Sequence, residues 1–214
     1  VHRLDKQTSG LIIVARNDAA HARLAAMFSG RQIRKTYLAL VHGEMKHDRG
    51  TIDAPIARDL QRRTRMTTRR ESGARHAVSH YTVLRRIPSR FGTFTLVSVP
   101  IEIGRTHQIR VHLASLGHPV VGDTLYGAPA RLIESAARGK SAPEPEPLAP
   151  GRNFLHAAEL EFVQPSTGKP LHFEAPLPRE LEQFLGRIES RKEPAAESRA
   201  AGSEAPQKIR RTKR

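Results

Sequence analysis

The sequence predicts an α+β fold with a mixed, largely antiparallel sheet and a few flanking helices. Two observations lead to this prediction. The chain contains several apolar segments of strand length and only a few segments with helical spacing. Most of the predicted strands follow one another through turn-rich links of hairpin length, whereas a doubly wound parallel sheet needs a helix between successive strands.

The first predicted elements are a buried strand and a helix. Residues 10–15 form a continuous apolar run with β-branched members, which is the pattern of a buried strand. Asn17 and Asp18 then offer a helix N-cap. Residues 19–28 carry apolar side chains at helical spacing, and Gly30 stands where such a helix usually ends.

Further strands and helices are predicted downstream. The strands are residues 36–41, 77–87, 93–101, 154–163 and 171–175. Turn-rich links at 88–92 and 165–168 join two pairs of these strands as hairpins. Residues 105–116 carry leucine and isoleucine at helical spacing, and residues 179–188 are predicted to form a closing helix.

Three stretches hold few core-forming residues. Residues 58–75 carry seven Arg against two acidic residues. Residues 129–151 are rich in Pro, Ala and Glu, which predicts a flexible surface insertion. Residues 190–214 have almost nothing to bury and predict a disordered basic tail. We therefore expect one folded domain over residues 1–189.

The charge balance favours a polyanionic partner. Lys and Arg number 36 against 21 Asp and Glu, a formal charge of +15, and nucleic acid is the commonest partner of such a chain. The absence of Cys excludes disulfides, Cys-ligated zinc and thiol nucleophiles. His107 and His112 are too far round a helix to share a metal, so no metal site is expected. No apolar run approaches the ~20 residues that span a bilayer, so no membrane partner is expected.

Two polar segments hold the candidate chemistry. Residues 2–11, His-Arg-Leu-Asp-Lys-Gln-Thr-Ser-Gly-Leu, place charged and hydroxyl side chains directly before a predicted strand. From charges alone, Asp5 between Arg3 and Lys6 is best interpreted as an ordinary surface ion pair. The second segment, residues 104–112, reads Gly-Arg-Thr-His-Gln-Ile-Arg-Val-His. Packing or phosphate binding alone does not require this density of donors at the head of a helix.

A helix over this second segment would separate its two arginines. Arg105 and Arg110 would lie about 140° apart around the axis and would serve different partners. His107, Arg110 and Ala114 would then share one face.

Together and in order, these motifs resemble the RluA-type family of RNA pseudouridine synthases. The resemblance rests on His-Arg-Leu-Asp-x-x-Thr-Ser-Gly, on Lys-Thr-Tyr-Leu-Ala-Leu at 35–40, and on the segment at 104–112. It continues through Gly-His-Pro-Val-Val-Gly-Asp at 117–123 and Leu-His-Ala at 155–157. It runs from Val1 to about Leu185 and implies the catalytic fold of that family.

The resemblance implies an isomerase that converts uridine to pseudouridine in RNA, most closely in large-subunit ribosomal RNA, without a cofactor or metal. The family's catalytic Asp, Tyr and Arg fall on Asp5, Tyr37 and Arg110. The Asp5 carboxylate attacks as a nucleophile or takes a sugar proton, and the sequence leaves both open. Tyr37 would pack under the base and help remove the C5 proton. Arg110 would keep the carboxylate ionised and oriented.

The same resemblance implies contacts to the RNA around the site. Arg3 would help turn the target nucleotide out of the stack, which the chemistry requires because the reacting bonds are otherwise buried. Further support of the site or RNA contact is expected from Arg105, Thr106 and His107. His156 is expected to be structural.

Two other functions account for part of the sequence. A non-catalytic basic RNA-binding module explains the charge equally well, but it does not explain the accompanying Asp and Tyr. A carboxylate-dependent N-glycoside hydrolase would cleave the same bond and release uracil. The family's upstream segment has no counterpart before Val1, so we expect a C-terminal portion of the catalytic domain. The expected protein is a cytoplasmic monomer.

Overall fold

The computed structural model describes residues 1–69, 72–134 and 147–190. The strands are β1 (Ser9–Gly10), β2 (Arg34–His42), β3 (Arg49–Asp53), β4 (Ala57–Arg58), β5 (Met66–Thr67), β6 (Val78–Ser89), β7 (Gly92–Ile101), β8 (Leu155–Val163) and β9 (Pro170–Glu174). The helices are α1 (Asp18–Ser29), α2 (Gln108–Ser115) and α3 (Arg179–Glu189), with a 3-10 turn, η1, at Thr124–Tyr126.

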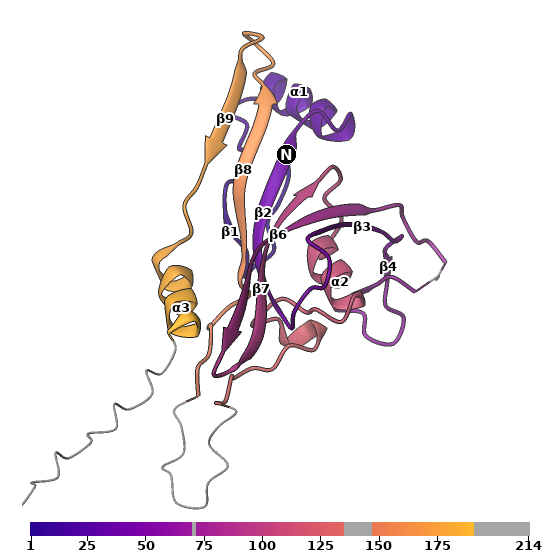
Figure 1. Ribbon diagram of the computed structural model, residues 1–214. Helices are drawn as coiled ribbons and strands as arrows, with labels where there is room; N and C mark the ends of the chain where they lie inside the picture. Colours follow the sequence, from indigo (N-terminus) through magenta and orange to yellow (C-terminus); the bar gives the residue numbers. More distant parts are fainter. Residues whose placement is uncertain (70–71, 135–146, 191–214) are drawn as a thin grey trace, which may run out of the picture.

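Seven strands form one mixed sheet in the order β1-β8-β2-β7-β6-β3, with β9 also paired to β8 (Figure 1). Every pairing in this sheet is antiparallel except that of β1 with β8. The short strands β4 and β5 form a separate hairpin. The α+β prediction with a largely antiparallel sheet is therefore confirmed.

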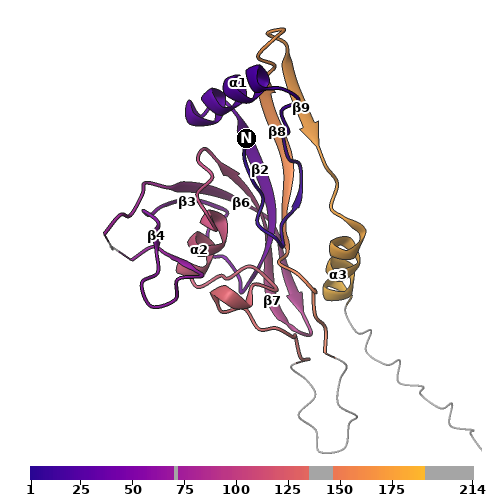
Figure 2. The ribbon, with the colours of Figure 1, turned by 180° about the vertical axis from the view of Figure 1, so that it is seen from behind.

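The central strands separate two cores because side chains alternate between the faces of a sheet. On one face, Tyr37, Ala39 and Val41 of β2 belong to a core that includes Ile109 and Leu113 of α2. On the other face, a second core joins side chains of β2, β7 and α3: Leu40, Leu96, Phe94, Leu181, Phe184 and Ile188. Figures 1 and 2 show α2 and α3 on opposite sides of the sheet. Within the described ranges, no helix has the length and apolar character needed to cross a bilayer.

Helix α1 follows the sequence prediction closely. The Asn17 side chain accepts a hydrogen bond from the backbone N–H of Ala20 at 2.8 Å, which satisfies a donor that the helix itself leaves free. Gly30 ends the helix, as expected. The buried side chains Leu24 and Met27 pack this helix against the sheet.

The buried strand predicted at residues 10–15 is wrong. In this part of the chain only Ser9 and Gly10 pair with β8, and residues 11–15 form no strand. Its alternate side chains pack beside α1, whereas Ile12 is 52% exposed and Val14 is 75% exposed. A continuous apolar run predicts cover on both faces. Within the described part of the chain, only one face of this segment is covered.

Two stretches that lack obvious core residues contribute to the fold. Residues 58–75 include the end of β4 and the whole of β5, which the sequence did not predict. The ends of the predicted insertion 129–151 pair through Leu132 and Leu148, whose side chains are buried, while most of the neighbouring described residues are exposed. Residues 135–146 and the tail after Ser190 lie outside the described residues.

Candidate active site

The N-terminal loop, β2 and the segment leading into α2 meet around one cavity. Its lining includes every residue that the sequence analysis assigned to the site: Arg3, Asp5, Tyr37, Arg105, Thr106, His107 and Arg110. Asp5 and Arg110, which touch there, are 105 positions apart in the sequence. The fold thus brings the candidate residues together, while their roles in a reaction stay predictions.

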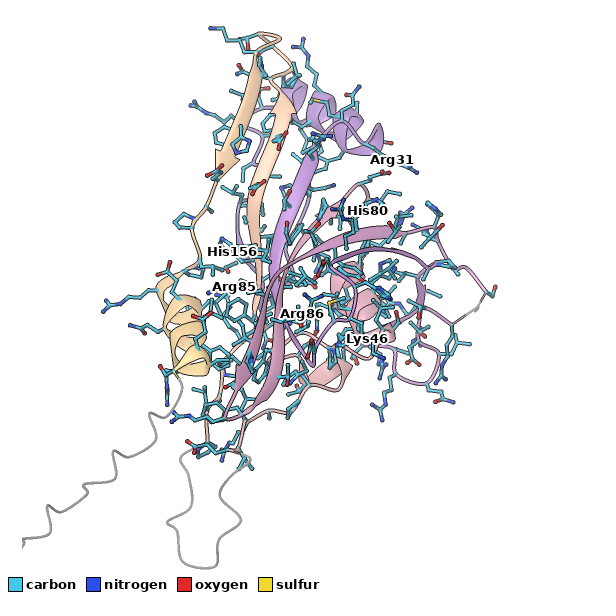
Figure 3. The ribbon with its side chains drawn as sticks, in the orientation of Figure 1. Arg31, Lys46, His80, Arg85, Arg86 and His156 are labelled. Atoms are coloured by element: carbon cyan, nitrogen blue, oxygen red, sulfur yellow. The ribbon has the colours of Figure 1, made fainter. Side chains whose placement is uncertain are left out.

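The loop that carries Asp5 is pinned to β8. The Ser9 hydroxyl lies 2.9 Å from Nδ1 of His156, whose Nε2–H donates to the carbonyl of Ala175 at 3.0 Å. Both ring nitrogens of His156, which Figure 3 labels, therefore have partners inside the protein, as expected of a structural histidine. At Gly10, where φ is +109°, a Cβ atom would lie 2.1 Å from the Ala157 carbonyl oxygen. Only glycine allows this close approach.

Tyr37 enters the cavity from β2. A register shift in the pairing of β2 with β8 falls between Thr36 and Tyr37, and such bulges re-aim the side chains beside them. The ring is buried, with 8% of the residue exposed. Burial and, secondarily, the negative charge of Asp5 raise the pKa of Tyr37 to about 12. The phenol therefore keeps its proton at neutral pH.

Arg110 lies between two carboxylates. Its Nη1 donates to Oδ2 of Asp5 at 3.1 Å. Its Nε and Nη2 donate to Oδ2 and Oδ1 of Asp123 at 2.6 Å and 2.9 Å, in a bidentate pair. Burial alone would lower the pKa of Arg110, but the hydrogen bonds and charges of Asp123 and Asp5 outweigh burial and raise it.

Asp123 is placed by a tight turn. Gly122 before it has φ of +84°, and a Cβ there would lie 2.2 Å from the carbonyl oxygen of Arg152. The Asp123 side chain is 1% exposed, whereas that of Asp5 is 19% exposed. One carboxylate is therefore enclosed with both oxygens bound, and the other faces the cavity.

His107 is the residue before the first turn of α2. Its backbone is left-handed, with φ of 56°, which is uncommon for a residue with a side chain. Its Nδ1 lies 2.9 Å from the Tyr126 hydroxyl, and its Nε2 lies 3.9 Å from Oδ2 of Asp5. His107 thus touches groups of the protein and also lines the cavity.

The helix begins three residues later than predicted. The left-handed backbone of His107 separates Arg105 and Thr106 from α2, so the helical angle expected between Arg105 and Arg110 does not apply. The two arginines nevertheless have different partners. The backbone N–H of Arg105 donates to Oε1 of Gln108 at 3.0 Å, and its Nε donates to the His76 carbonyl at 3.4 Å.

Sequence reasoning missed two residues that contact the site residues from outside the cavity lining. Asp123 binds Arg110, and Tyr126 contacts His107. Asp123 ends a motif that carried the family resemblance, and Tyr126 follows three residues later. Neither residue was assigned a role. A signal for Asp123 was present, because a lone charged side chain follows Val120, Val121 and Gly122 in an otherwise apolar turn. An acidic residue in such a place usually has a buried partner.

A second, larger cavity is a weaker candidate for an active site than the Asp5 cavity. It measures about 530 Å³, against about 90 Å³ for the Asp5 cavity, and its lining includes Arg31 and His80 (Figure 3). Arg31 pairs with Glu102 at 3.4 Å, and Lys35 donates to the Glu102 carbonyl at 3.1 Å. The Asp5 cavity is smaller, but it combines a half-buried carboxylate, a phenol and a guanidinium. Among the described residues, no three His, Asp or Glu side chains are grouped so that they could hold a metal.

Comparison with known proteins identifies the class to which this fold and cavity belong. The sequence model described as RNA pseudouridylate synthase matches residues 1–115. The chain is 43% identical to the uncharacterized RNA pseudouridine synthase YlyB of Bacillus subtilis, covering 86% of this chain and 54% of the relative. It is 41% identical to ribosomal large subunit pseudouridine synthase D of Xanthomonas campestris, covering 92% of this chain and 56% of the relative.

A solved structure agrees with the sequence relatives. Human RNA pseudouridylate synthase domain containing 1 superposes with a TM-score of 0.64 at 31% identity, covering 82% of this chain and 67% of the human one. The chain therefore belongs to the RNA pseudouridylate synthase family. It spans about half the length of the curated relatives it matches.

Proposed function

We propose that this chain carries the catalytic site of an RNA pseudouridine synthase, an isomerase that converts uridine to pseudouridine in large-subunit ribosomal RNA. The geometry of Asp5 supports the proposal most directly. Arg110 binds its Oδ2, and Oδ1 accepts no hydrogen bond from the described residues. One oxygen is fixed while the other is free to react at the cavity. The ribosomal substrate is supported by the name of the Xanthomonas relative.

The reaction needs the target nucleotide outside its stack, because the reacting bonds are otherwise buried in the helix. Arg3 is exposed at the rim, where its guanidinium can replace the flipped base or contact phosphate. The Asp5 carboxylate then attacks C1′ or takes a sugar proton to give a glycal, and both routes remain open. In either route the N1–C1′ bond breaks, the uracil turns and a C5–C1′ bond forms. The C5 proton leaves and N1 gains one, so the product is an isomer of uridine.

Tyr37 contributes a buried ring beside Asp5 on which the uracil can pack. Its raised pKa, about 12, means that the phenol is protonated in the empty site. To accept the C5 proton, as the family resemblance implies, Tyr37 must first lose its own proton after RNA binds. A Tyr37→Phe variant would then bind RNA and stop before the C5 proton is lost.

Two alternatives explain less of the geometry. A non-catalytic RNA-binding module gains nothing from a carboxylate at the centre of an arginine-rimmed cavity, because Asp5 repels phosphate. An N-glycoside hydrolase could use the same carboxylate, but it would release free uracil rather than keep the base on the RNA. The monomeric state and the cytoplasmic location stay predictions.

The Asp5→Asn variant tests the proposal against both alternatives. Ribosomal RNA fragments are incubated with each protein, and pseudouridine, uridine and free uracil are separated after digestion, beside filter binding of the same RNA. The amide keeps the size of the side chain and removes its charge, so we expect conversion to fall at least ~10³-fold with binding retained. The control is Asp53→Asn, an exposed carboxylate at the end of β3 that contacts only His76 among the described ion pairs.

Three results would contradict the proposal. Undiminished conversion by Asp5→Asn removes the carboxylate from the chemistry. Binding without conversion by the wild-type chain favours the RNA-binding module. Free uracil in place of pseudouridine favours the hydrolase.

A further inference from the structure

Tyr126, in the turn η1, is a buried tyrosine to which the proposed mechanism assigns no role. The residue is 6% exposed. Its hydroxyl accepts a hydrogen bond from the backbone N–H of Met66 in β5 at 2.8 Å and lies 2.9 Å from Nδ1 of His107. The guanidinium carbons of Arg65 and Arg110 lie 5.3 Å and 5.1 Å from the centre of its ring. Tyr126 therefore contacts both the β4–β5 hairpin and two residues that line the cavity, His107 and Arg110.

The hydrogen bonds at this hydroxyl determine which nitrogen of His107 carries a proton. A backbone N–H can only donate, so the Tyr126 oxygen accepts from Met66. The pKa of Tyr126 is raised to about 12, chiefly by burial, so the phenol also has a proton to donate. Nδ1 of His107 is the acceptor in reach. If Nδ1 carried a proton instead, the hydroxyl would receive two donors and its own proton would have no acceptor among the described residues.

A neutral His107 must then carry its proton on Nε2, which lies 3.9 Å from Oδ2 of Asp5. The pKa of His107 is lowered by burial first and then by Arg110, while Asp5 and Asp123 oppose the shift and Arg3 adds to it. The lowered pKa favours the neutral ring at pH 7. Arg110 donates to the same Oδ2. Both groups are thus on one oxygen of the carboxylate, and Oδ1 is left to the substrate.

We propose that Tyr126 is a positioning residue for the synthase reaction, holding His107 so that its Nε2–H faces Oδ2 of Asp5. This inference rests on the proposed function, because it concerns how the reacting carboxylate is oriented. The 3.9 Å separation is longer than a hydrogen bond, so the contact must shorten when substrate closes the site. The left-handed backbone of His107 fits this role, since it places the ring between Tyr126 and Asp5.

The β4–β5 hairpin is part of the same arrangement. Met66 supplies the N–H that sets the direction of the Tyr126 hydroxyl. The neighbouring Arg65 pairs with Asp59 at 3.4 Å and covers the Tyr126 ring. If the hairpin moved away from Tyr126, the hydroxyl would lose the hydrogen bond from Met66 and could rotate. His107 could then change tautomer. The packing of the hairpin against Tyr126 and the orientation of Asp5 are therefore linked.

The test combines a tautomer measurement with single-turnover kinetics. Proton–nitrogen correlation spectra of the histidine rings identify the proton-bearing nitrogen, and loss of one signal set in His107→Gln assigns His107. We expect the Nε2–H form in the wild-type chain and a mixture of tautomers in Tyr126→Phe. The single-turnover rate of Tyr126→Phe should fall about tenfold, the scale of one hydrogen bond. Its affinity for RNA should stay within a factor of two.

Further variants separate positioning from packing. His107→Leu should lose at least as much rate as Tyr126→Phe, because it removes the donor completely. His107→Gln, whose amide can place a donor near Asp5, should recover most of the loss. The double variant Tyr126→Phe with His107→Leu should be no slower than His107→Leu alone, because Tyr126 acts through His107. Tyr81→Phe is the matched control, since it removes the hydroxyl of another buried tyrosine that does not line the cavity, and it should keep the wild-type rate.

Two outcomes would overturn the inference. One is an Nδ1–H tautomer of His107 in the wild-type chain. The other is a Tyr126→Phe protein that melts earlier but reacts at the wild-type rate. Failure of the proposed function looks different, because the wild-type chain itself would then form no pseudouridine whatever tautomer the spectra report.

Discussion

The two carboxylates that contact Arg110 are held in opposite ways. Asp123 follows a glycine-dependent turn, is almost fully buried, and uses both oxygens on the guanidinium. Asp5 lies on a loop before the two-residue strand β1, is partly exposed, and makes one hydrogen bond to the same guanidinium. The same chemical group is therefore enclosed in one place and presented to a cavity in the other.

The difference shows how a fold can orient a carboxylate through one oxygen and leave its other oxygen free to react. Asp123 accepts two hydrogen bonds from Arg110, and Asp5 accepts one. Because the pair with Asp123 has fixed geometry, the Nη1 that faces Asp5 is fixed as well. In the proposed function, Asp123 orients the arginine and Asp5 reacts.

Replacing the shared arginine should give the largest effect. Arg110→Met leaves Asp123 buried without a partner, and removing one member of a buried pair costs about 3–5 kcal/mol of stability. Asp5 also loses its anchor, so we expect pseudouridine formation to become undetectable. Chemical denaturation and the nucleoside assay measure the two losses. The control is Arg86→Met, which removes a more exposed arginine bound to Asp48 and Met45 and should cost under ~1 kcal/mol. Equal losses of stability and activity in the two variants would contradict the role of Arg110 as the shared partner of Asp5 and Asp123.

The two aspartates should differ in what they do for stability. In Asp123→Asn, the amide NH₂ faces the donors of Arg110, and an unsatisfied buried group costs about 1–3 kcal/mol. In Asp5→Asn, water reaches the side chain, so we expect less than ~1 kcal/mol. Denaturant midpoints with a common slope compare the two variants directly. If Asp5→Asn were the less stable of the two, the assignment of the enclosed and the open carboxylate would be reversed.

The smallest expected effect is a shift in one tyrosine titration. The charge of Asp5 contributes to the raised pKa of Tyr37, and that of Asp123 does not. Asp5→Asn should therefore lower the Tyr37 pKa from about 12, and Asp123→Asn should leave it unchanged. Phenolate absorbance, taken as the difference between each protein and its Tyr37→Phe partner, measures the change. An equal shift in both variants would contradict the separation of the two carboxylates.

The same shift has a consequence for stability at high pH. The folded pKa of Tyr37 lies above the unfolded value near 10, so the neutral phenol contributes stability below about pH 10. That contribution is lost as the pH rises toward the folded pKa of about 12. The loss should begin at about the same pH in Asp5→Asn and end at a lower one.

Local pattern was sufficient for much of this molecule. The strands β2, β6, β7, β8 and β9 and the helices α1 and α3 lie within a few residues of their predicted positions, because period and capping are local properties. The candidate site was also readable, since Asp5, Tyr37 and Arg110 stand in motifs that resemble one family. The fold places all three around one cavity.

Tertiary contacts decided the rest. The apolar run at 11–15 packs beside α1 on one face only, and its other face is exposed. A local sequence pattern does not determine how many faces of a segment are buried. The start of α2 depends on the left-handed backbone of His107, which lies between Tyr126 and Asp5. The pairing of Arg110 with Asp123 likewise depends on two segments meeting in space. Composition and periodicity determined the kind of fold and the groups available to it. Burial and distance, which depend on how distant segments pack, determined which of those groups are bound and which one stays free.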